Sequence, residues 1–126
     1  MINNFVYNKS LLKSFGYAFE GVWHAFKYNR NLRIDFFTAC VVLALGIFFR
    51  VTAFEMAILL IMILLVILSE MINTAIEEMV NLITTEHRRE AKIAKDVAAG
   101  MVLVTAIGSV IVGILIFVPH ILKLFT

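Results

Sequence analysis

The sequence predicts an all-α integral membrane protein with three transmembrane helices and an amino-terminal amphipathic surface helix. Hydrophobic residues make up 62% of the 126 residues and charged residues only 16%, which differs from the usual balance of a soluble globular domain. The apolar residues also form three runs without any charged residue, at residues 36–49, 56–69 and 97–119. A chain of this length is expected to form a single domain over residues 1–126.

The positions of the helices follow from these runs. A spanning helix needs about 20 mostly apolar residues, so the third run suffices by itself and the first two must extend into their weakly charged flanks. We therefore expect spans at about residues 33–50, 55–83 and 96–121. Residues 8–28 repeat apolar side chains at helical spacing with lysines between them, which favours a helix at the membrane surface. Packing of that helix on the protein's own spans would produce the same pattern.

The basic residues are distributed unevenly along the chain, and this predicts the orientation. Nine of the eleven lysines and arginines precede the first span or lie between the second and third, and the positive-inside rule assigns both regions to the cytoplasm. We expect a multi-pass protein of the inner membrane with its amino terminus in the cytoplasm. The first 33 residues lack the apolar core of a signal peptide, so that terminus is expected to be retained. The nine are Lys9, Lys13, Lys27, Arg30, Arg33, Arg88, Arg89, Lys92 and Lys95.

The second apolar run continues without a break into a stripe of polar residues, Glu70, Asn73, Glu77 and Asn81. At about 100° per residue, Glu70, Glu77 and Asn81 lie within roughly 40° of one another around the helix, and Asn73 lies about 60° from Glu70. An ionisable residue in a spanning helix is costly and usually marks a functional site. The stripe is therefore a candidate site, with hydrogen bonding to neighbouring helices as the alternative.

The chemistry of these residue types indicates phosphoryl transfer. Glu70, at the deeper end of the stripe, suits a general base, and Glu77, nearer the water, suits a ligand of a hard divalent cation. Lys95 and Asp96 could meet a phosphate, although such a pair also caps helices. The polar connection 84–95 is either a solvated loop or a phosphate-contacting segment. The sequence contains no P-loop, Gly-rich kinase loop or zinc motif, so Mg²⁺ and scattered cations would have to hold the phosphates of ATP.

Two motifs resemble the small prokaryotic diacylglycerol kinase and undecaprenol kinase family. They are Glu70-Met-Ile-Asn73-Thr-Ala-Ile-Glu77 and Ala94-Lys95-Asp96-Val-Ala-Ala-Gly100, and the similarity extends over nearly the whole chain. The resemblance implies ATP-dependent phosphorylation of a membrane lipid alcohol, undecaprenol or diacylglycerol, with Mg²⁺ as cofactor. It also implies a homotrimer with sites between subunits and no nucleic-acid partner. The second motif is more similar to the undecaprenol-kinase branch.

The resemblance also implies a role for each matching residue. It makes Glu70 the catalytic base and Glu77 a metal ligand, and it puts Asn73, Lys95 and Asp96 in contact with nucleotide or substrate.

The sequence departs from the family pattern at two positions. Asn29 stands where well-studied members carry an acidic metal ligand, and Asn81 stands where they carry an aspartate. Each replacement removes a negative charge but keeps an oxygen acceptor, so Asn29 is a weaker candidate ligand for the metal than the family's acid. These departures leave a catalytically weakened homologue as one alternative. A small ion or proton pathway lined by Glu70 and Glu77 is another, although Lys95 and Asp96 would have no use in it.

Overall fold

The computed structural model describes residues 10–126, and these residues form four α-helices and no strand. The helices are α1 (Leu11–Tyr28), α2 (Arg30–Phe48), α3 (Ala53–Ile83) and α4 (Arg89–Lys123). Three of them, α2, α3 and α4, are long and apolar enough to cross a membrane. The predicted fold class is thereby confirmed. The start of the predicted surface helix, with Lys9, lies outside the described residues.

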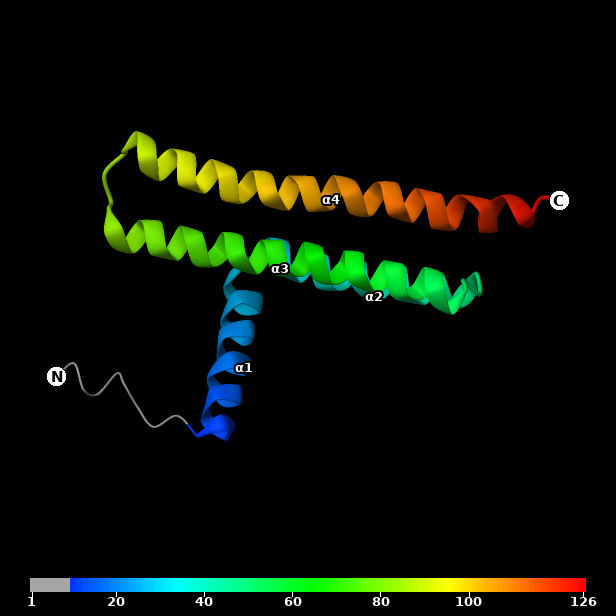
Figure 1. Ribbon diagram of the computed structural model, residues 1–126, viewed down its shortest axis with the longest axis horizontal. Coiled ribbons are helices and arrows are strands. Elements are labelled where there is room, and N and C mark those ends of the chain that lie inside the picture. Colours follow the sequence, from blue (N-terminus) through cyan, green and yellow to red (C-terminus); the bar gives the residue numbers. More distant parts are fainter. Residues whose placement is uncertain (1–9) are drawn as a thin grey trace.

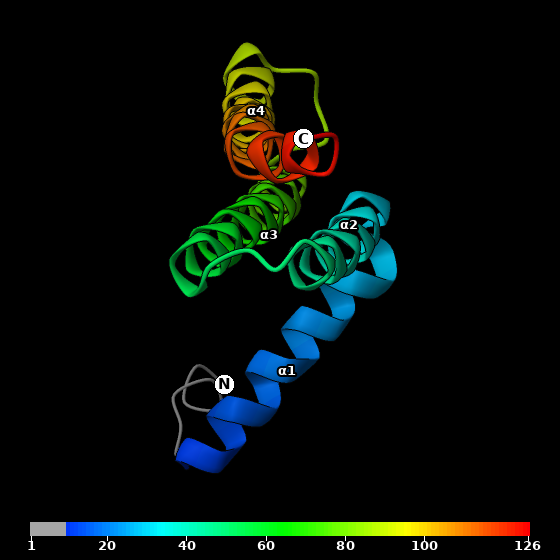
Figure 2. The same ribbon diagram turned by 90° about the vertical axis from the view of Figure 1, so that its right-hand side faces the viewer.

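The three long helices lie side by side along the long axis of the molecule, with α3 between α2 and α4 (Figures 1 and 2). The most extensive helix contact is that of α3 with α4, and the next is that of α2 with α3. Helix α1 leaves α2 roughly across this axis (Figure 1). It meets α2 near the bend, where the rings of Phe26 and Phe36 pack edge to face with centroids 5.5 Å apart.

Most of the large apolar side chains of α1 are not covered by the spans of the same chain. Leu12 is 84% exposed, Phe19 73% and Trp23 63%. Within the single chain, packing on the protein's own spans, the alternative explanation of the amphipathic pattern, describes only the end of this helix near α2, where Ala25 is buried and Phe26 meets Phe36. Large exposed aromatic side chains next to lysines are typical of helices that lie in the membrane interface.

The bend between α1 and α2, residues 26–33, is held by side chains that cap both helices, and we call it the elbow. Asn29 has extended backbone angles (φ −108°, ψ 107°), and its Oδ1 accepts hydrogen bonds from two amides in the first turn of α2 at 2.9 and 3.2 Å. Arg33 Nη1 donates to the carbonyl oxygens of Phe26 and Lys27 at 3.0 and 2.6 Å. Orphan amides of α2 and orphan carbonyls of α1 are thus satisfied at one place, which defines the angle of the bend.

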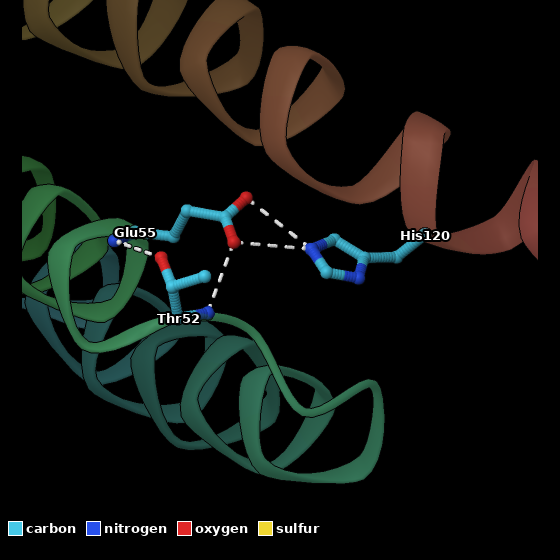
Figure 3. A network of polar contacts seen from close by, with 3 residues as sticks. All are labelled: Thr52, Glu55 and His120. Atoms are coloured by element: carbon cyan, nitrogen blue, oxygen red, sulfur yellow. Dashed lines mark hydrogen bonds and ion pairs between the residues drawn. The ribbon is translucent and has the colours of Figure 1, made fainter.

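The opposite end of the bundle, which holds the α2–α3 turn, is closed by a small polar network (Figure 3). Thr52 and Glu55 form a capping box: Thr52 Oγ1 accepts from the Glu55 amide at 3.1 Å, and Glu55 Oε1 accepts from the Thr52 amide at 2.9 Å. His120 in the last turns of α4 lies against the same carboxylate, with its Nε2 3.1 and 3.2 Å from the two oxygens. The network ties the start of α3 to the end of α4.

Helix α4 begins at Arg89, seven residues before the predicted start at residue 96, so the loop between α3 and α4 is limited to residues 84–88. Good helix formers such as Glu90 and Lys92 continue the helix into solvated sequence. At 1.5 Å per residue α3 and α4 are about 46 and 52 Å long and α2 about 28 Å, whereas the hydrocarbon core of a bilayer is about 30 Å thick. Helices α3 and α4 therefore project beyond the elbow (Figure 1).

Candidate active site

Glu70 lies in the middle of α3, at the point where the elbow meets this helix. Its side chain is 2% exposed, and Oε1 accepts a hydrogen bond from Asn29 Nδ2 at 3.0 Å. The same Nδ2 donates to Thr74 Oγ1 at 2.6 Å, and Thr74 in turn donates to the Glu70 carbonyl oxygen at 3.0 Å. The elbow is thus attached to α3 through the carboxylate that the sequence predicts to be the base.

The orientation of the Asn29 amide follows from its partners. The backbone amides of α2 need an acceptor, so the oxygen must face them, and the Glu70 carboxylate needs a donor, so the nitrogen must face it. Both partners require the same orientation. The oxygen that would bind a metal is therefore already engaged in capping α2.

Two further acceptor atoms near Glu70 are buried without a partner among residues 10–126, Asn73 Oδ1 and Asp35 Oδ2. Asn73 is 9% exposed and lies one helical turn from Glu70. Asp35, on α2, is close enough to Glu70 for the two carboxylates to interact electrostatically. Buried polar atoms are nearly always hydrogen-bonded, so two buried oxygen atoms without a donor, close to a buried carboxylate, require an explanation. These unpartnered acceptor atoms are suited to receive a donor, such as a hydroxyl group or a cation's water.

Next to Glu70, a polar contact holds α4 against α3. Ser69 Oγ and Thr105 Oγ1 are 2.9 Å apart, and each also lies within hydrogen-bond distance of a carbonyl of its own helix, so one hydroxyl donates across the pair while the other donates to its own helix. The sequence analysis did not single out this pair, or Thr74. Serine and threonine in apolar helices are common, and only the packing of α3 on α4 shows which of them meet.

The outer half of the stripe lies in a different environment. Glu77 and Asn81 are exposed, because they lie beyond the elbow on the projecting part of α3. Lys95 Nζ donates to Asn81 Oδ1 at 2.8 Å, and Lys92 pairs with Asp96 Oδ2 at 2.6 Å. Asn81 and Glu70 are eleven residues apart, about 16 Å along the helix. Within one chain, Lys95 is therefore brought to Asn81 and not to Glu70.

A cleft of about 720 Å³ opens between the end of α3 and the start of α4. The predicted site residues Lys95 and Asp96 line it together with Asn81, and so does the whole loop of residues 84–88. This size lies within the range of small-molecule sites. Four cationic side chains, Arg88, Arg89, Lys92 and Lys95, line the cleft beside the two acidic ones, Glu86 and Asp96, and the excess of positive charge suits a polyphosphate.

The residues predicted to bind a metal differ in how well they fit that role. Within residues 10–126 no three or more His, Cys, Asp or Glu residues gather into a group that could hold a metal ion. Mg²⁺ does not need such a cage, because it keeps several waters and is held by one or two carboxylates together with substrate phosphates. The exposed carboxylate of Glu77 fits this requirement. Asn29 fits it poorly, since its oxygen caps α2.

Comparison with known proteins identifies the family. Residues 16–117 match the family model of prokaryotic diacylglycerol kinases. The chain belongs to this family. The match extends over most of α1 and into the last third of α4, and it includes the elbow, the stripe and the cleft. The family is one of lipid kinases, so the resemblance and the enzyme class expected from the two motifs are confirmed.

Three curated relatives illustrate the family. A diacylglycerol kinase of Synechocystis is 43% identical over 116 residues, which are 91% of this chain and 66% of that protein, so the chain spans slightly less than two thirds of it. An undecaprenol kinase of Bacillus subtilis is 42% identical over 85% of this chain and 87% of its own length. A diacylglycerol kinase of Haemophilus influenzae is 33% identical over 85% of this chain and 92% of its own length.

Proposed function

We propose that this lipid kinase transfers the γ-phosphoryl group of ATP to the hydroxyl group of a membrane lipid alcohol, with Glu70 as the general base. Glu70 takes the proton of the hydroxyl, the hydroxyl oxygen bonds to the γ-phosphorus, and ADP leaves with the electrons of the broken P–O bond. The observation that carries the proposal is a buried carboxylate with two unpartnered acceptor atoms nearby, Asn73 Oδ1 one helical turn away and Asp35 Oδ2 on α2. Asn73 Oδ1 would accept a hydrogen bond from the incoming substrate.

The depth of Glu70 supports this role. The 17 residues from Ala53 to Glu70 rise about 26 Å, close to the thickness of the hydrocarbon core. If α1 lies in the interface, the elbow and Glu70 lie at the boundary between hydrocarbon and water. A lipid alcohol holds its hydroxyl group at this level, so the acceptor can reach the base without leaving the membrane.

The cleft at the projecting end supports a nucleotide site. Lys95 would contact the phosphates of ATP and Asp96 would hold Lys92 in place or contact the nucleotide. Glu77, between the cleft and Glu70 along α3, would hold Mg²⁺ together with the phosphates. When bound, Mg²⁺ neutralises phosphate charge and so lowers the barrier to transfer.

We propose a homotrimer with sites between subunits, as the family resemblance implies. The lipid hydroxyl must lie within about 3 Å of the base and must also meet the γ-phosphate that Lys95 is proposed to contact. In one chain, Lys95 donates to Asn81, which is about 16 Å from Glu70 along α3. A site in which the cleft of one subunit faces the base of the next removes this discrepancy. The basic residues of the elbow and the α3–α4 loop further support an orientation with the amino terminus in the cytoplasm, where ATP is available.

A direct assay tests the proposal. Purified protein in lipid nanodiscs is given ATP, with or without Mg²⁺, and either diacylglycerol or undecaprenol, and the phosphorylated lipid is measured. We expect Mg²⁺-dependent product that Glu70→Gln abolishes while Glu78→Gln, an exposed neighbour outside the stripe, leaves it intact. Product from a folded Glu70→Gln variant would remove the base assignment. Robust turnover by the natural chain would exclude a weakened homologue despite Asn29 and Asn81.

The acceptor lipid is decided by the same assay. The Synechocystis and Haemophilus relatives are named diacylglycerol kinases and the Bacillus relative an undecaprenol kinase, and the identities of 43% and 42% do not separate the two. We propose undecaprenol, because the motif that ends at Gly100 is more similar to that branch. A kcat/KM for undecaprenol at least about tenfold above that for diacylglycerol, or about 1.4 kcal/mol, is expected, and the reverse order would contradict it.

A further inference from the structure

The side chain of Asn29 connects the start of α2 to the middle of α3, two regions that are far apart in sequence. Its oxygen accepts from two amides in the first turn of α2, and its nitrogen donates to Glu70 and Thr74 on α3, 41 and 45 residues away. Asparagine can do this because its amide carries both an acceptor and two donors. Neither a glutamate nor an aspartate could donate to Glu70 in the same way.

The surroundings of Glu70 make this donor important. The nearby Asp35 carboxylate and the Asn73 oxygen are acceptors, and neither can stabilise a second negative charge. A buried carboxylate needs donors to stay oriented, and a hydrogen bond to a charged group is stronger than one between neutral groups. Asn29 supplies such a donor at 3.0 Å.

We propose that Asn29 is the positioning residue for the Glu70 carboxylate, and that it acts through its amide nitrogen and not as a ligand of Mg²⁺. The inference rests on the proposed role of Glu70 as base. It explains how the chain retains an ordered site at a position where well-studied relatives carry an acid. It also links the site to α1. Arg33 and Asn29 together set the angle of the elbow, and the hydrogen bond from Asn29 to Glu70 makes the position of the carboxylate depend on that angle.

Two substitutions separate the functions of the side chain. Serine and aspartate are both good N-caps, so Asn29→Ser and Asn29→Asp keep the start of α2. Serine cannot reach Glu70, and aspartate faces it with a like charge. We expect kcat to fall about 10-fold in Asn29→Ser and about 100-fold in Asn29→Asp, with the KM values for ATP and lipid and the Mg²⁺ concentration for half-maximal activity within about twofold of the natural chain.

A metal-ligand role predicts the opposite result for aspartate. An added carboxylate would then strengthen Mg²⁺ binding, so Asn29→Asp would lower the Mg²⁺ requirement several-fold with kcat kept or raised. That outcome, or full kcat in Asn29→Ser, overturns the proposal. Asn31→Asp is the matched control, because it adds the same charge two residues further along, at an exposed position, and is expected to keep kcat within about twofold.

The same set of variants distinguishes failure of this inference from failure of the proposed function. Glu70→Gln is measured in parallel: if it is active, the base assignment fails and Asn29 has no base to position. If Glu70→Gln is inactive and Asn29→Ser is fully active, only the role of Asn29 fails. Circular dichroism and thermal unfolding of each variant in detergent identify any loss of kcat that arises from misfolding. If Asn29→Ser unfolds and Asn29→Asp stays folded, the kcat and Mg²⁺ requirement of Asn29→Asp decide between the two roles.

Discussion

Helix α3 carries two glutamates that each bond to another part of the chain, and they differ in what surrounds them. Glu55 lies in the first turn, in a capping box, with the His120 ring against both of its oxygens (Figure 3). Glu70 lies fifteen residues further, about 22 Å along the axis, in the middle of the helix. It is 2% exposed, and one oxygen of Asp35 and the amide oxygen of Asn73, both nearby, have no hydrogen-bond donor among residues 10–126.

The difference shows how a structural carboxylate differs from a candidate catalytic one. At Glu55 the donors come from the helix terminus and from a side chain that can carry positive charge, so the carboxylate is satisfied by the fold. At Glu70 the fold supplies a neutral amide and leaves acceptor atoms nearby unpaired, which supports the proposal that a ligand brings the missing donors. The four predictions that follow test this contrast, in order of decreasing effect.

The largest effect is expected from removing the two carboxylates one at a time. Glu70→Gln should lower kcat by about 10³-fold, in line with the contribution of a general base, while the same change at Glu55 should leave kcat within about twofold. The measurement is ATP-dependent phosphorylation of the lipid in nanodiscs. A comparable loss in Glu55→Gln would show that the two glutamates do not differ in function.

The cationic cleft provides the second test. Lys95→Met removes an ammonium group that is proposed to contact phosphate and should lower kcat/KM for ATP about 100-fold. Lys123→Met makes the same change in the last turn of α4, at the end of the bundle that holds Glu55, and should have no measurable effect. If both variants lose activity equally, the charge of the protein as a whole and not the cleft would be responsible.

The network at the other end should affect stability and not turnover. His120→Leu removes the ring that bonds the Glu55 carboxylate and should lower the free energy of unfolding by about 1–2 kcal/mol, with kcat unchanged. Unfolding in detergent, followed by circular dichroism, measures this. In the double variant with Glu55→Gln the two losses should be less than additive; additivity within about 0.3 kcal/mol would mean that the two side chains do not interact.

The smallest effect is expected for the neutral contact beside the site. Ser69→Ala removes the hydrogen bond to Thr105 and should cost about 0.6 kcal/mol, the average for such bonds between membrane helices. Turnover should change by no more than about threefold, since no charge is removed. A loss of turnover as large as that of Glu70→Gln would assign Ser69 to the machinery around the base.

Much of the fold could be predicted from the sequence, because its signals are local. Charge-free runs identified the spans, helical spacing identified α1, and the polar stripe identified Glu70 as a candidate base. The starts of α2 and α3 were expected at residues 33 and 55, three and two residues after the observed ones, because Asn29 and the capping box of Thr52 and Glu55 begin these helices earlier. The start of α4 was expected seven residues too late, because charged residues were assigned to a loop although they are good helix formers.

The contacts between helices could not be predicted in this way. The four polar residues of the stripe look alike in the sequence. Because α2 begins beside Glu70 and covers only the part of α3 before the elbow, Glu70 and Asn73 are buried while Glu77 and Asn81 are exposed. The pairings of Asn29 with Glu70, Asn81 with Lys95, and Glu55 with His120 join residues 14 to 65 positions apart. The roles proposed for Asn29 and Asn81 depend on these pairings.

The sequence by itself determined the helices, the membrane class and the family, because hydrophobicity, helical period and end caps act over a few turns of one helix. Only the tertiary structure decided which polar side chains meet. In lipid, apolar surface alone does little to set the rotation and register of one helix against another, so these depend on the packing of particular side chains. The position of Asn29 against Glu70 follows from that packing and from the angle of the elbow.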